Sequence, residues 1–267
     1  MPREITAYSN PLIKRMRSLR EKRHRREEGL FLAEGLRILT EAREAGRIPE
    51  FLFFARDSAA HPLVLALVDA VEAAGGEAIE TVPDILSKLS GKDNPQAVVG
   101  VFAEFTRTLD SLDRDSAAIW LVAERMRDPG ILGTILRTGD AVGAGGLILI
   151  GECVDPFSVE AVRASMGALF TVPVVQCEWE AFVPWLRGGA GQLVGLSLDT
   201  TTDYRAAAYR APTFLLIGNE AQGLPADYAA ACDVRVKIPM LGKADSLNAA
   251  VACAVMAYEV LRQRCIA

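Results

Sequence analysis

Short apolar segments alternate with helical segments along the chain, and this alternation constrains the fold more than any other feature. Runs of β-branched and aliphatic residues without a polar face are typical of strands covered by helices on both sides of a sheet. Six such runs follow residue 116, at 117–124, 146–151, 171–176, 193–198, 213–218 and 234–239. Helical segments separate them near 130–142, 158–169, 179–187, 204–208 and 224–231. The sequence therefore predicts an α/β domain with a mainly parallel sheet.

The first hundred residues show a less regular version of the same alternation. Strands are predicted at 29–35, 50–55, 77–82 and 97–105, and helices at 11–28, 36–46, 62–76 and from Pro83. The segment TRTLDSLDRDS, 106–116, is polar and aperiodic, which is typical of a connection between domains. We therefore expect a smaller N-terminal α/β domain over 1–106, a linker over 107–116 and a second domain over 117–267.

Composition narrows the chemistry that the chain can perform. Only two histidines occur, His24 and His61, and the five cysteines form no CxxC pair, which removes most zinc sites and Ser-His-Asp triads, so we expect no metal. This cysteine usage indicates a reduced compartment, no apolar run is long enough to span a membrane, and the first residues lack a signal-peptide core. We expect a cytoplasmic protein whose catalysis depends on arginine, glutamate, serine, asparagine or a bound cofactor.

Charge is distributed unevenly along the chain. The net charge is −5, yet the first 30 residues carry nine lysines and arginines against four glutamates. The nine cations are Arg3, Lys14, Arg15, Arg17, Arg20, Lys22, Arg23, Arg25 and Arg26. Such asymmetry favours a basic arm that binds a polyanion, although a solvated helix face would give the same pattern.

Three predicted strand ends share an unusual loop chemistry. Ligands of open α/β sheets bind outside the carboxyl ends of the strands. Ser197 and Asp199 follow one strand, GNEAQGLP at 218–225 follows the next, and MLGKADSLN at 240–248 follows the last. Glycines in such loops let the backbone approach a ligand closely. No loop contains a GxxxxGK[ST] motif, and the GAGG at 143–146 is not a GxGxxG in a strand-to-helix turn, so a dinucleotide-binding oxidoreductase is a less favoured alternative.

The helix predicted near 130–142 carries a strip of small residues. Asp128 and Pro129 are a typical N-cap and first helical residue. Spacings of three and four place a group of small residues and one guanidinium on the same face: Gly130, Gly133, Thr134 and Arg137. This face would suit the approach of a phosphate, whereas the alternative is a tightly packed helix with a surface arginine.

The last helix opens with more polar side chains than capping requires. Asp245 or Ser246 is expected to cap its first turn, and Asn248 follows directly. Apolar residues at 247, 250, 251, 254, 255, 258 and 261 have the spacing of one helix face, which we expect to be buried. A well-capped core helix explains this pattern only in part, because one capping side chain would be sufficient.

Three longer motifs contain these features: DPGxxGxxxRTxDAxGA from Asp128, IGNEAQGLP from Ile217 and IPMxGKADSLNAAVACAVMAYE from Ile238. In order and spacing they resemble the three motifs of the SpoU (TrmH) family of RNA ribose 2′-O-methyltransferases. The basic start and the segment FLAEGLRILTEA, 31–42, are also similar to the substrate-binding domain at the N-terminus of that family. The resemblance covers nearly the whole chain, and the second and third motifs are long enough to be specific.

The resemblance implies a fold, a cofactor and a set of site residues. The second domain would be an α/β trefoil-knot (SPOUT) methyltransferase domain that works as a homodimer, and the smaller N-terminal domain would be a ribosomal-protein-like RNA-binding fold. S-adenosylmethionine would be bound at positions that match the family's cofactor site: Ser197, Gly218, Asn219, Ile238, Met240 and Leu247. The positions that match its catalytic residues are Arg137, Glu220, Ser246 and Asn248.

The implied reaction is methyl transfer to a ribose 2′-hydroxyl of structured RNA. Because the sulfonium methyl group is already activated, the enzyme mainly aligns the reacting atoms and helps to remove one proton. Arg137 has the family role of a proposed base, but arginine stays protonated in proteins, so clamping a phosphate suits it better. Glu220 would orient Arg137 or steady its loop, and Ser246 and Asn248 would hydrogen-bond the ribose or a phosphate. A separate N-terminal domain favours ribosomal RNA over tRNA, by family analogy.

One residue departs from the family pattern, because Ile131 stands where asparagine is usual. Isoleucine has no side-chain hydrogen bond to offer, so an RNA-binding member with impaired catalysis is the alternative to an active enzyme. A nucleotide-binding α/β protein outside the family is a more distant alternative. The active enzyme is favoured by the intact catalytic positions Arg137, Glu220, Ser246 and Asn248.

Overall fold

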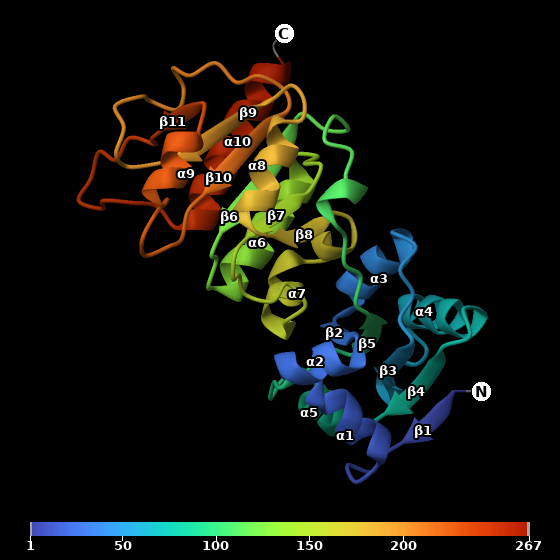
Figure 1. Ribbon diagram of the computed structural model, residues 1–267. Helices are drawn as coiled ribbons and strands as arrows, with labels where there is room; N and C mark the ends of the chain where they lie inside the picture. The colour runs from blue at the N-terminus through green and yellow to red at the C-terminus, as the bar shows by residue number, and fades with distance from the viewer. Residues whose placement is uncertain (1, 266–267) are drawn as a thin grey trace. The chain divides into compact units, whose positions relative to one another are not determined.

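The computed structural model describes residues 2–265, which divide into two α/β units (Figure 1). The first unit runs to Phe105 and also contains Asp155–Thr171. The second contains Thr106–Val154 and the chain from Val172 onward. Within the described residues, no helix is long and apolar enough to cross a membrane.

The first unit is built on a five-stranded mixed sheet in the order β1-β4-β3-β5-β2. Its strands are β1 (Arg3–Ile5), β2 (Leu30–Glu34), β3 (Phe51–Ala55), β4 (Glu77–Thr81) and β5 (Val98–Ala103). Its helices are α1 (Pro11–Ser18), α2 (Lys22–Glu28), α3 (Leu36–Glu44), α4 (Pro62–Ala73), α5 (Pro83–Ser90) and α7 (Val159–Ser165). Strand β5 is antiparallel to both of its neighbours, and the other pairs are parallel. The sequence predicted all of these strands except β1, which is short and largely exposed.

The basic segment predicted as one helix over 11–28 is two helices, and Arg25 explains the break. The Arg25 side chain is only 3% exposed. Its Nη1 donates to the carbonyl oxygens of Leu19 and Arg20, both at 2.9 Å, and so satisfies backbone acceptors between α1 and α2. Its Nε and Nη2 donate to Asp155 at 3.0 and 2.6 Å. Arg25 is therefore a structural residue and not part of an exposed basic arm.

The segment Asp155–Thr171 belongs to the first unit, although the sequence placed it within the second domain, 117–267. Phe157 and Phe170 pack against Phe31 of β2, with ring centroids 4.8 and 6.0 Å apart. In addition, Arg163 of α7 forms a 2.6 Å ion pair with the buried Glu34. The local sequence indicates a helix but does not name its packing partner, so this exchange of chain between the units could not be predicted.

The second unit is built on a six-stranded sheet in the order β11-β9-β10-β6-β7-β8, in which every pair is parallel. Its strands are β6 (Ile119–Glu124), β7 (Leu147–Ile150), β8 (Val174–Cys177), β9 (Gln192–Leu196), β10 (Thr213–Ile217) and β11 (Val234–Val236). Its helices are α6 (Pro129–Ala141), α8 (Trp179–Arg187), α9 (Ala226–Ala231) and α10 (Ala249–Cys265). The parallel α/β architecture predicted from the sequence is therefore confirmed.

The core of the second unit lies on both faces of this sheet. On one face, Trp120 of β6 stacks on Phe214 of β10, and Phe182 of α8 packs with them. Helices α6 and α10 contact each other, and α10 also packs on β10 and β6. Strands β6 and β10 are thus buried between helices, as expected for apolar strands of a parallel sheet.

One predicted helix is absent, because residues 204–208 form turns. The N–H of Tyr204 donates to the carbonyl of Lys237 at 3.0 Å, and the Asp203 carboxylate accepts from the backbone N–H of Arg205 at 2.9 Å. The Tyr209 N–H donates to the Gln263 side chain at 3.2 Å. The Asp203 side chain nearby and the distant Lys237 and Gln263 thus provide hydrogen bonds in place of those of a helix.

Candidate functional site

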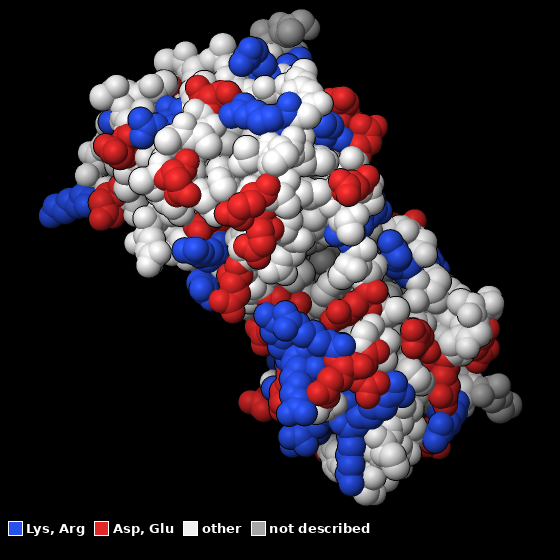
Figure 2. Space-filling model, viewed as in Figure 1, with Lys and Arg blue, Asp and Glu red and all other residues white. Residues whose placement is uncertain are grey.

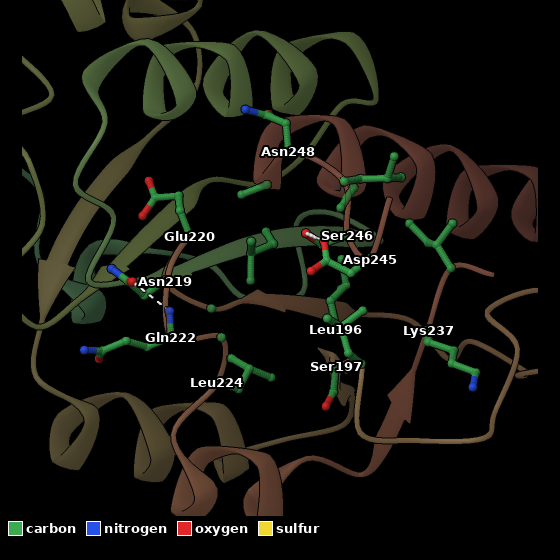
Figure 3. Close-up of a pocket in the computed structure, with 18 of the residues that line it drawn as sticks. Leu196, Ser197, Asn219, Glu220, Gln222, Leu224, Lys237, Asp245, Ser246 and Asn248 are labelled. Atoms are coloured by element: carbon green, nitrogen blue, oxygen red, sulfur yellow. Dashed lines mark hydrogen bonds between the residues drawn. The ribbon is translucent and has the colours of Figure 1, made fainter. Parts of the chain in front are cut away.

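A cleft of about 670 Å³ lies at the carboxyl ends of β9, β10 and β11 (Figure 3). Its walls come from three connections: residues 196–199, an anchored loop at 218–224 and an open loop at 238–248. The lining also includes Ile131 near the start of α6, Ala252 in α10, and Ile217, Val236, Lys237 and Ala249 beside the three connections. Because β9 is paired in parallel with both β10 and β11, their carboxyl ends meet at one edge of the sheet.

The cleft brings together most of the residues that the sequence indicated. Its lining includes all six expected cofactor positions: Ser197, Gly218, Asn219, Ile238, Met240 and Leu247. It also includes three of the expected catalytic positions: Glu220, Ser246 and Asn248. Arg137 is not part of this lining. It lies on the exposed face of α6, and its guanidinium forms no hydrogen bond or ion pair with any residue that the structure describes.

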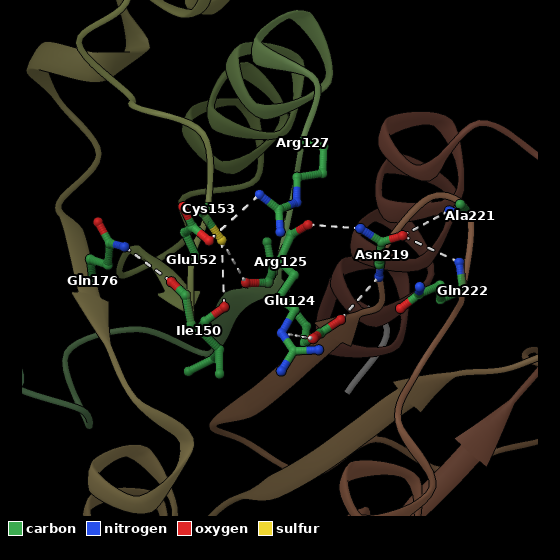
Figure 4. Close-up of polar contacts among 12 residues, drawn as sticks. Glu124, Arg125, Arg127, Ile150, Glu152, Cys153, Gln176, Asn219, Ala221 and Gln222 are labelled. Carbon is green, nitrogen blue, oxygen red and sulfur yellow. Dashed lines mark hydrogen bonds and ion pairs between the residues drawn. The ribbon is translucent and has the colours of Figure 1, made fainter. Parts of the chain in front are cut away.

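The anchored loop owes its shape to Asn219 (Figure 4). The Asn219 Oδ1 accepts from the backbone N–H groups of Ala221 and Gln222 at 2.9 and 3.2 Å, and its carbonyl accepts from Gly223 at 2.9 Å. Gly223 has a φ of 68°, and a Cβ on Gly218 would lie 2.4 Å from the Gly223 carbonyl carbon. Asparagine and glycine are therefore required locally by the turn itself.

Glu220 contacts the turn that begins α6. Its Oε1 accepts from the backbone N–H groups of Arg127 and Asp128, each at 3.3 Å. Asp128 in turn caps α6, because its Oδ1 accepts from the Ile131 N–H at 2.9 Å. Of the two roles considered from the sequence, the contacts favour steadying the loop over orienting Arg137.

The start of the last helix differs from the prediction. The cap is Asn248, whose Oδ1 accepts from the N–H groups of Ala250 and Val251 at 3.0 and 3.4 Å. The expectation that Asp245 or Ser246 would cap the helix was therefore wrong. The Ser246 hydroxyl instead donates to the Asp245 carboxylate at 3.2 Å, and both residues line the cleft (Figure 3).

Only one residue of the helix face predicted to be buried, Ala250, is buried, and the others are exposed or half-buried. Val251 and Tyr258 are 49% and 52% exposed, and Leu247 just before the helix is 36% exposed. The buried stripe is rotated from this face, shares only Ala250 with it, and also contains Cys253, Met256, Ala257 and Val260. Apolar residues occur all round this helix, so spacing alone could not identify which face packs on the sheet.

The cleft carries more acidic than basic side chains. Three carboxylates line it, Asp199, Glu220 and Asp245, and Lys237 is the one cation in the lining. A fourth carboxylate, Glu124 at the end of β6, lies behind the anchored loop, and burial raises the pKa of its carboxyl group. Such a lining favours a ligand that carries positive charge.

The sequence missed several residues that shape the cleft. Lys237, Leu198 and Leu224 line it beside residues that were singled out. Glu124 was also missed, although a charged residue that ends an otherwise apolar strand is a visible signal. Its importance depends on a contact with Asn219, 95 residues later, which no local pattern reports.

Comparison with known proteins agrees with this geometry. Residues 118–258 match the SpoU rRNA Methylase family, and residues 10–100 match the MRM3-like substrate binding domain. A 23S rRNA uridine 2′-O-methyltransferase of Streptomyces viridochromogenes is 34% identical over 98% of this chain and 93% of that protein. A 23S rRNA guanosine 2′-O-methyltransferase of Bacillus subtilis is 27% identical over 97% of this chain and 99% of that protein.

A solved structure shows the same likeness in three dimensions. An AdoMet-bound rRNA methyltransferase from Sinorhizobium meliloti matches with a TM-score of 0.90 and 38% identity, covering 97% of each chain. The family match extends over all three motifs and over the three connections that form the cleft. The chain therefore belongs to the SpoU rRNA methylase family.

Proposed function

We propose that this protein transfers a methyl group from S-adenosylmethionine to the 2′-hydroxyl of a ribose in ribosomal RNA, in the cytoplasm. The observation that carries the proposal is the convergence of the three family motifs on one side of the sheet, where the second and third form the walls of a single cleft and the first contributes Ile131. The relatives named above methylate 23S rRNA, and one relative was solved with AdoMet bound.

The cleft fits this cofactor in size and chemistry. S-adenosylmethionine, when bound, supplies a methyl group activated by a sulfonium cation. Asp199 and Asp245 favour such a charge, and the absence of a side chain at Gly218 leaves the backbone open to close approach. The apolar wall would be formed by Ile238, Met240 and Leu247, and the polar contacts by Ser197, Gly218 and Asn219. No metal is needed, because the methyl group already has a good leaving group.

Residues near the starts of α6 and α10 would bind the RNA nucleotide that is methylated. Ser246 and Asn248 lie in the open loop, where their side chains can hydrogen-bond a ribose or phosphate. Arg137 would clamp a phosphate and orient the nucleotide, because a guanidinium is a permanent cation with a bidentate donor pattern. Glu220 would contribute by holding the turn before α6 in place.

We extend the proposal to a homodimer in which two chains build each active site. The exposed stripe of α10, with Val251 and Tyr258, continues from Leu247 at the cleft, so a second copy would cover an apolar surface beside the site. Arg137, which is exposed and outside the cleft of its own chain, could then reach the cleft of its partner. We also propose that the methyltransferase domain forms a trefoil knot, which the placement of β10 between β6 and β9 supports.

Mixed dimers test this arrangement. Arg137→Ala and Leu247→Arg chains should each be inactive alone, the first in the transfer step and the second in cofactor binding. If Arg137 serves the partner's cleft, subunit exchange should restore about a quarter of the wild-type sites, because half of the dimers are mixed and each has one intact site. No recovery from verified mixed dimers would place Arg137 in the site of its own chain, and a strictly monomeric protein in light scattering would refute the dimer.

We further propose that the domain over 1–106 binds the RNA substrate, with 107–116 as the linker to the methyltransferase domain over 117–267. Figure 2 shows Lys and Arg side chains gathered over α1 and α2. Arg15 and Arg23 form ion pairs with Glu28 and Glu27. The exposed cations on these helices without an ion pair to a described residue include Lys14, Arg17, Lys22 and Arg26.

Neutralising these four unpaired cations with glutamine tests the RNA-binding role. RNA affinity should fall, and the slope of log K against log salt should flatten by about 0.7–0.9 for each phosphate that the protein no longer neutralises. A matched control is Arg3→Gln with Arg56→Gln, since both arginines are exposed but paired with carboxylates. Because the control removes two charges and the test set removes four, equal effects per charge removed would mean that only net charge matters, not this surface.

The methyl-transfer assay decides between an active enzyme and an impaired RNA-binding protein. Labelled methyl groups should be transferred to deproteinised ribosomal RNA from a strain that lacks the gene, and digestion should yield a 2′-O-methyl nucleoside. A base-methylated nucleoside would refute the proposed function. Transfer to tRNA alone would support the tRNA alternative.

Ile131 motivates the impaired alternative, because an apolar side chain lines the cleft where the family usually has asparagine. If the missing amide merely weakens alignment, Ile131→Asn should raise the rate about tenfold, the value of one hydrogen bond of about 1.4 kcal/mol. A neutral or harmful effect would mean that another residue fulfils this role. Cofactor binding without any transfer by the wild type, with transfer only in Ile131→Asn, would establish the impaired alternative.

A further inference from the structure

Glu124 is a charged residue in a place where the sequence and the packing favour an apolar one. It ends β6, whose other residues, Ile119–Ala123, are all apolar and buried, and Glu124 itself is only 1% exposed. Burying a carboxylate is unfavourable unless it is paired and hydrogen-bonded. The partners of Glu124 therefore indicate why it is there.

Those partners are the anchored loop and its own neighbour (Figure 4). Glu124 Oε2 accepts from the backbone N–H of Asn219 at 3.3 Å. Glu124 Oε1 lies 3.3 Å from Arg125 Nε and has no hydrogen-bond partner within the described residues. Among the residues that the structure describes, Asn219 is thus the one hydrogen-bond partner of this carboxylate.

Three further hydrogen bonds join the anchored loop to residues 125–128, the turn between β6 and α6. Asn219 Nδ2 donates to the Arg125 carbonyl at 2.8 Å, and Glu220 accepts from the N–H groups of Arg127 and Asp128. Arg125 has a φ of 42°, a conformation that non-glycine residues seldom adopt. Left-handed backbone of this kind persists only where the surroundings determine it. Two consecutive loop residues are therefore fixed to one turn, and Glu124 is the buried member of the set.

We propose that Glu124 is a positioning residue for cofactor binding, whose carboxylate oxygen holds the Asn219 N–H and with it the anchored loop in the form that receives S-adenosylmethionine. The proposal rests on the assignment of the cleft to this cofactor. Glu124 does not line the cleft, so it acts through Asn219 and not by contact with the ligand. The relevant property is the reach of its oxygen and not its charge.

Two substitutions separate reach from charge. Glu124→Gln keeps an oxygen at the same reach and removes the charge, whereas Glu124→Asp keeps the charge and shortens the side chain by one methylene. We expect calorimetry to show an S-adenosylmethionine Kd within about threefold of wild type for Glu124→Gln, and a Kd raised about tenfold or more for Glu124→Asp, the usual scale for losing one hydrogen bond. Any other ranking of the two variants would overturn the proposal.

The kinetic signature distinguishes positioning from general destabilisation. In Glu124→Asp, KM for the cofactor should rise with its Kd, while kcat at saturating cofactor should stay within about threefold of wild type, because Arg137, Ser246 and Asn248 are untouched. A fall in kcat with KM unchanged would contradict the proposed role.

Gln192→Ala is a matched control in the same unit. Gln192 is 4% exposed, and its Oε1 accepts from the backbone N–H of Arg210 at 3.1 Å, at the end of β9 opposite the cleft. It should lower the melting temperature without changing the cofactor Kd; an equal rise in Kd would mean that the effect of Glu124 is only structural. Leu247→Arg reports on the cleft itself: if that variant binds S-adenosylmethionine normally, the site assignment fails independently of Glu124.

Discussion

The two loops that form most of the cleft differ in how they are held. In the anchored loop, Asn219 and Gly223 close a turn by hydrogen bonds, and Asn219 and Glu220 bond to the turn before α6. In the open loop, residues 238–247 form no backbone–backbone hydrogen bond with any part of the chain that is described, and 241–248 are all exposed. We infer that the anchored loop is ordered when the protein folds, whereas the open loop becomes ordered on binding.

The difference has a thermodynamic meaning. Ordering a loop costs conformational entropy whenever it occurs. For the anchored loop this cost is included in folding, so a ligand meets a prepared surface. For the open loop the cost falls on binding, so affinity depends on what the ligand, the RNA or a second subunit contributes there. The following predictions test this contrast, from the largest expected effect to the smallest.

Leu247→Arg should abolish S-adenosylmethionine binding, with a loss of affinity of more than about 100-fold, because it places a bulky cation in the cleft beside a cationic ligand. Calorimetry measures the loss. Leu241→Arg is the matched control: Leu241 belongs to the same open loop but is 98% exposed and does not line the cleft. If both variants bind normally, the open loop is not a wall of the cofactor site.

Hydrogen exchange should distinguish the loops directly. Without ligand, the amides of Ala221, Gln222 and Gly223 should exchange at least about tenfold more slowly than those of 241–247, since only the former are hydrogen-bonded. Adding S-adenosylmethionine should slow exchange in the open loop and change the anchored loop little. Equal rates in the two loops before ligand is added would contradict the comparison.

Asn248→Ala should lower the free energy of unfolding by about 1 kcal/mol, because it removes the cap at the junction of the open loop and α10. Denaturant unfolding measures the change. Asn248→Asp retains a capping oxygen and should keep the stability, yet lower methyl transfer by repelling an RNA phosphate. Normal transfer by Asn248→Asp would indicate that Asn248 has a structural role only.

The smallest effect concerns the pH dependence of stability at Glu124. Burial raises the pKa of its carboxyl group, so folding favours the protonated form. This contribution to wild-type stability is full below the unfolded pKa of about 4.3 and is lost as pH rises through the folded value. Glu124→Gln cannot ionise, so its melting temperature relative to wild type should decline as pH falls from 8 to 4. A relative increase toward acid would give the opposite sign for the pKa shift.

Features with a local cause were predictable from the sequence. The strands of the second unit, the Asp128 cap and the Asn219–Gly223 turn each depend on residues close in sequence, and Ser197 and Leu247, which the family resemblance indicated, both lie in the cleft lining. These features result from apolar runs, capping side chains and turn glycines, each of which can be recognised within a short stretch of sequence.

Features that depend on distant partners were not predictable. Arg25 has the sequence context of a surface cation, yet it is buried and hydrogen-bonded to Asp155, 130 residues away. The exposed face of α10, with Val251 and Tyr258, was predicted to be buried, because apolar spacing alone does not show what the face packs against. Glu124 needed the contact with Asn219 before its place at the end of a strand had a meaning.

The chain passes between its units three times, after Phe105, after Val154 and after Thr171, and this limits how the protein can be dissected. Removing the first 105 residues would not liberate an intact catalytic half, because α7 and its flanks would remain without the surface on which they fold. Phe157 and Phe170 would then face water, and Arg163 would lose Glu34. Because β7 and β8 are parallel neighbours in the sheet, excision should therefore replace Asp155–Thr171 with a polar crossover connection long enough to run back along the sheet from the end of β7 to the start of β8.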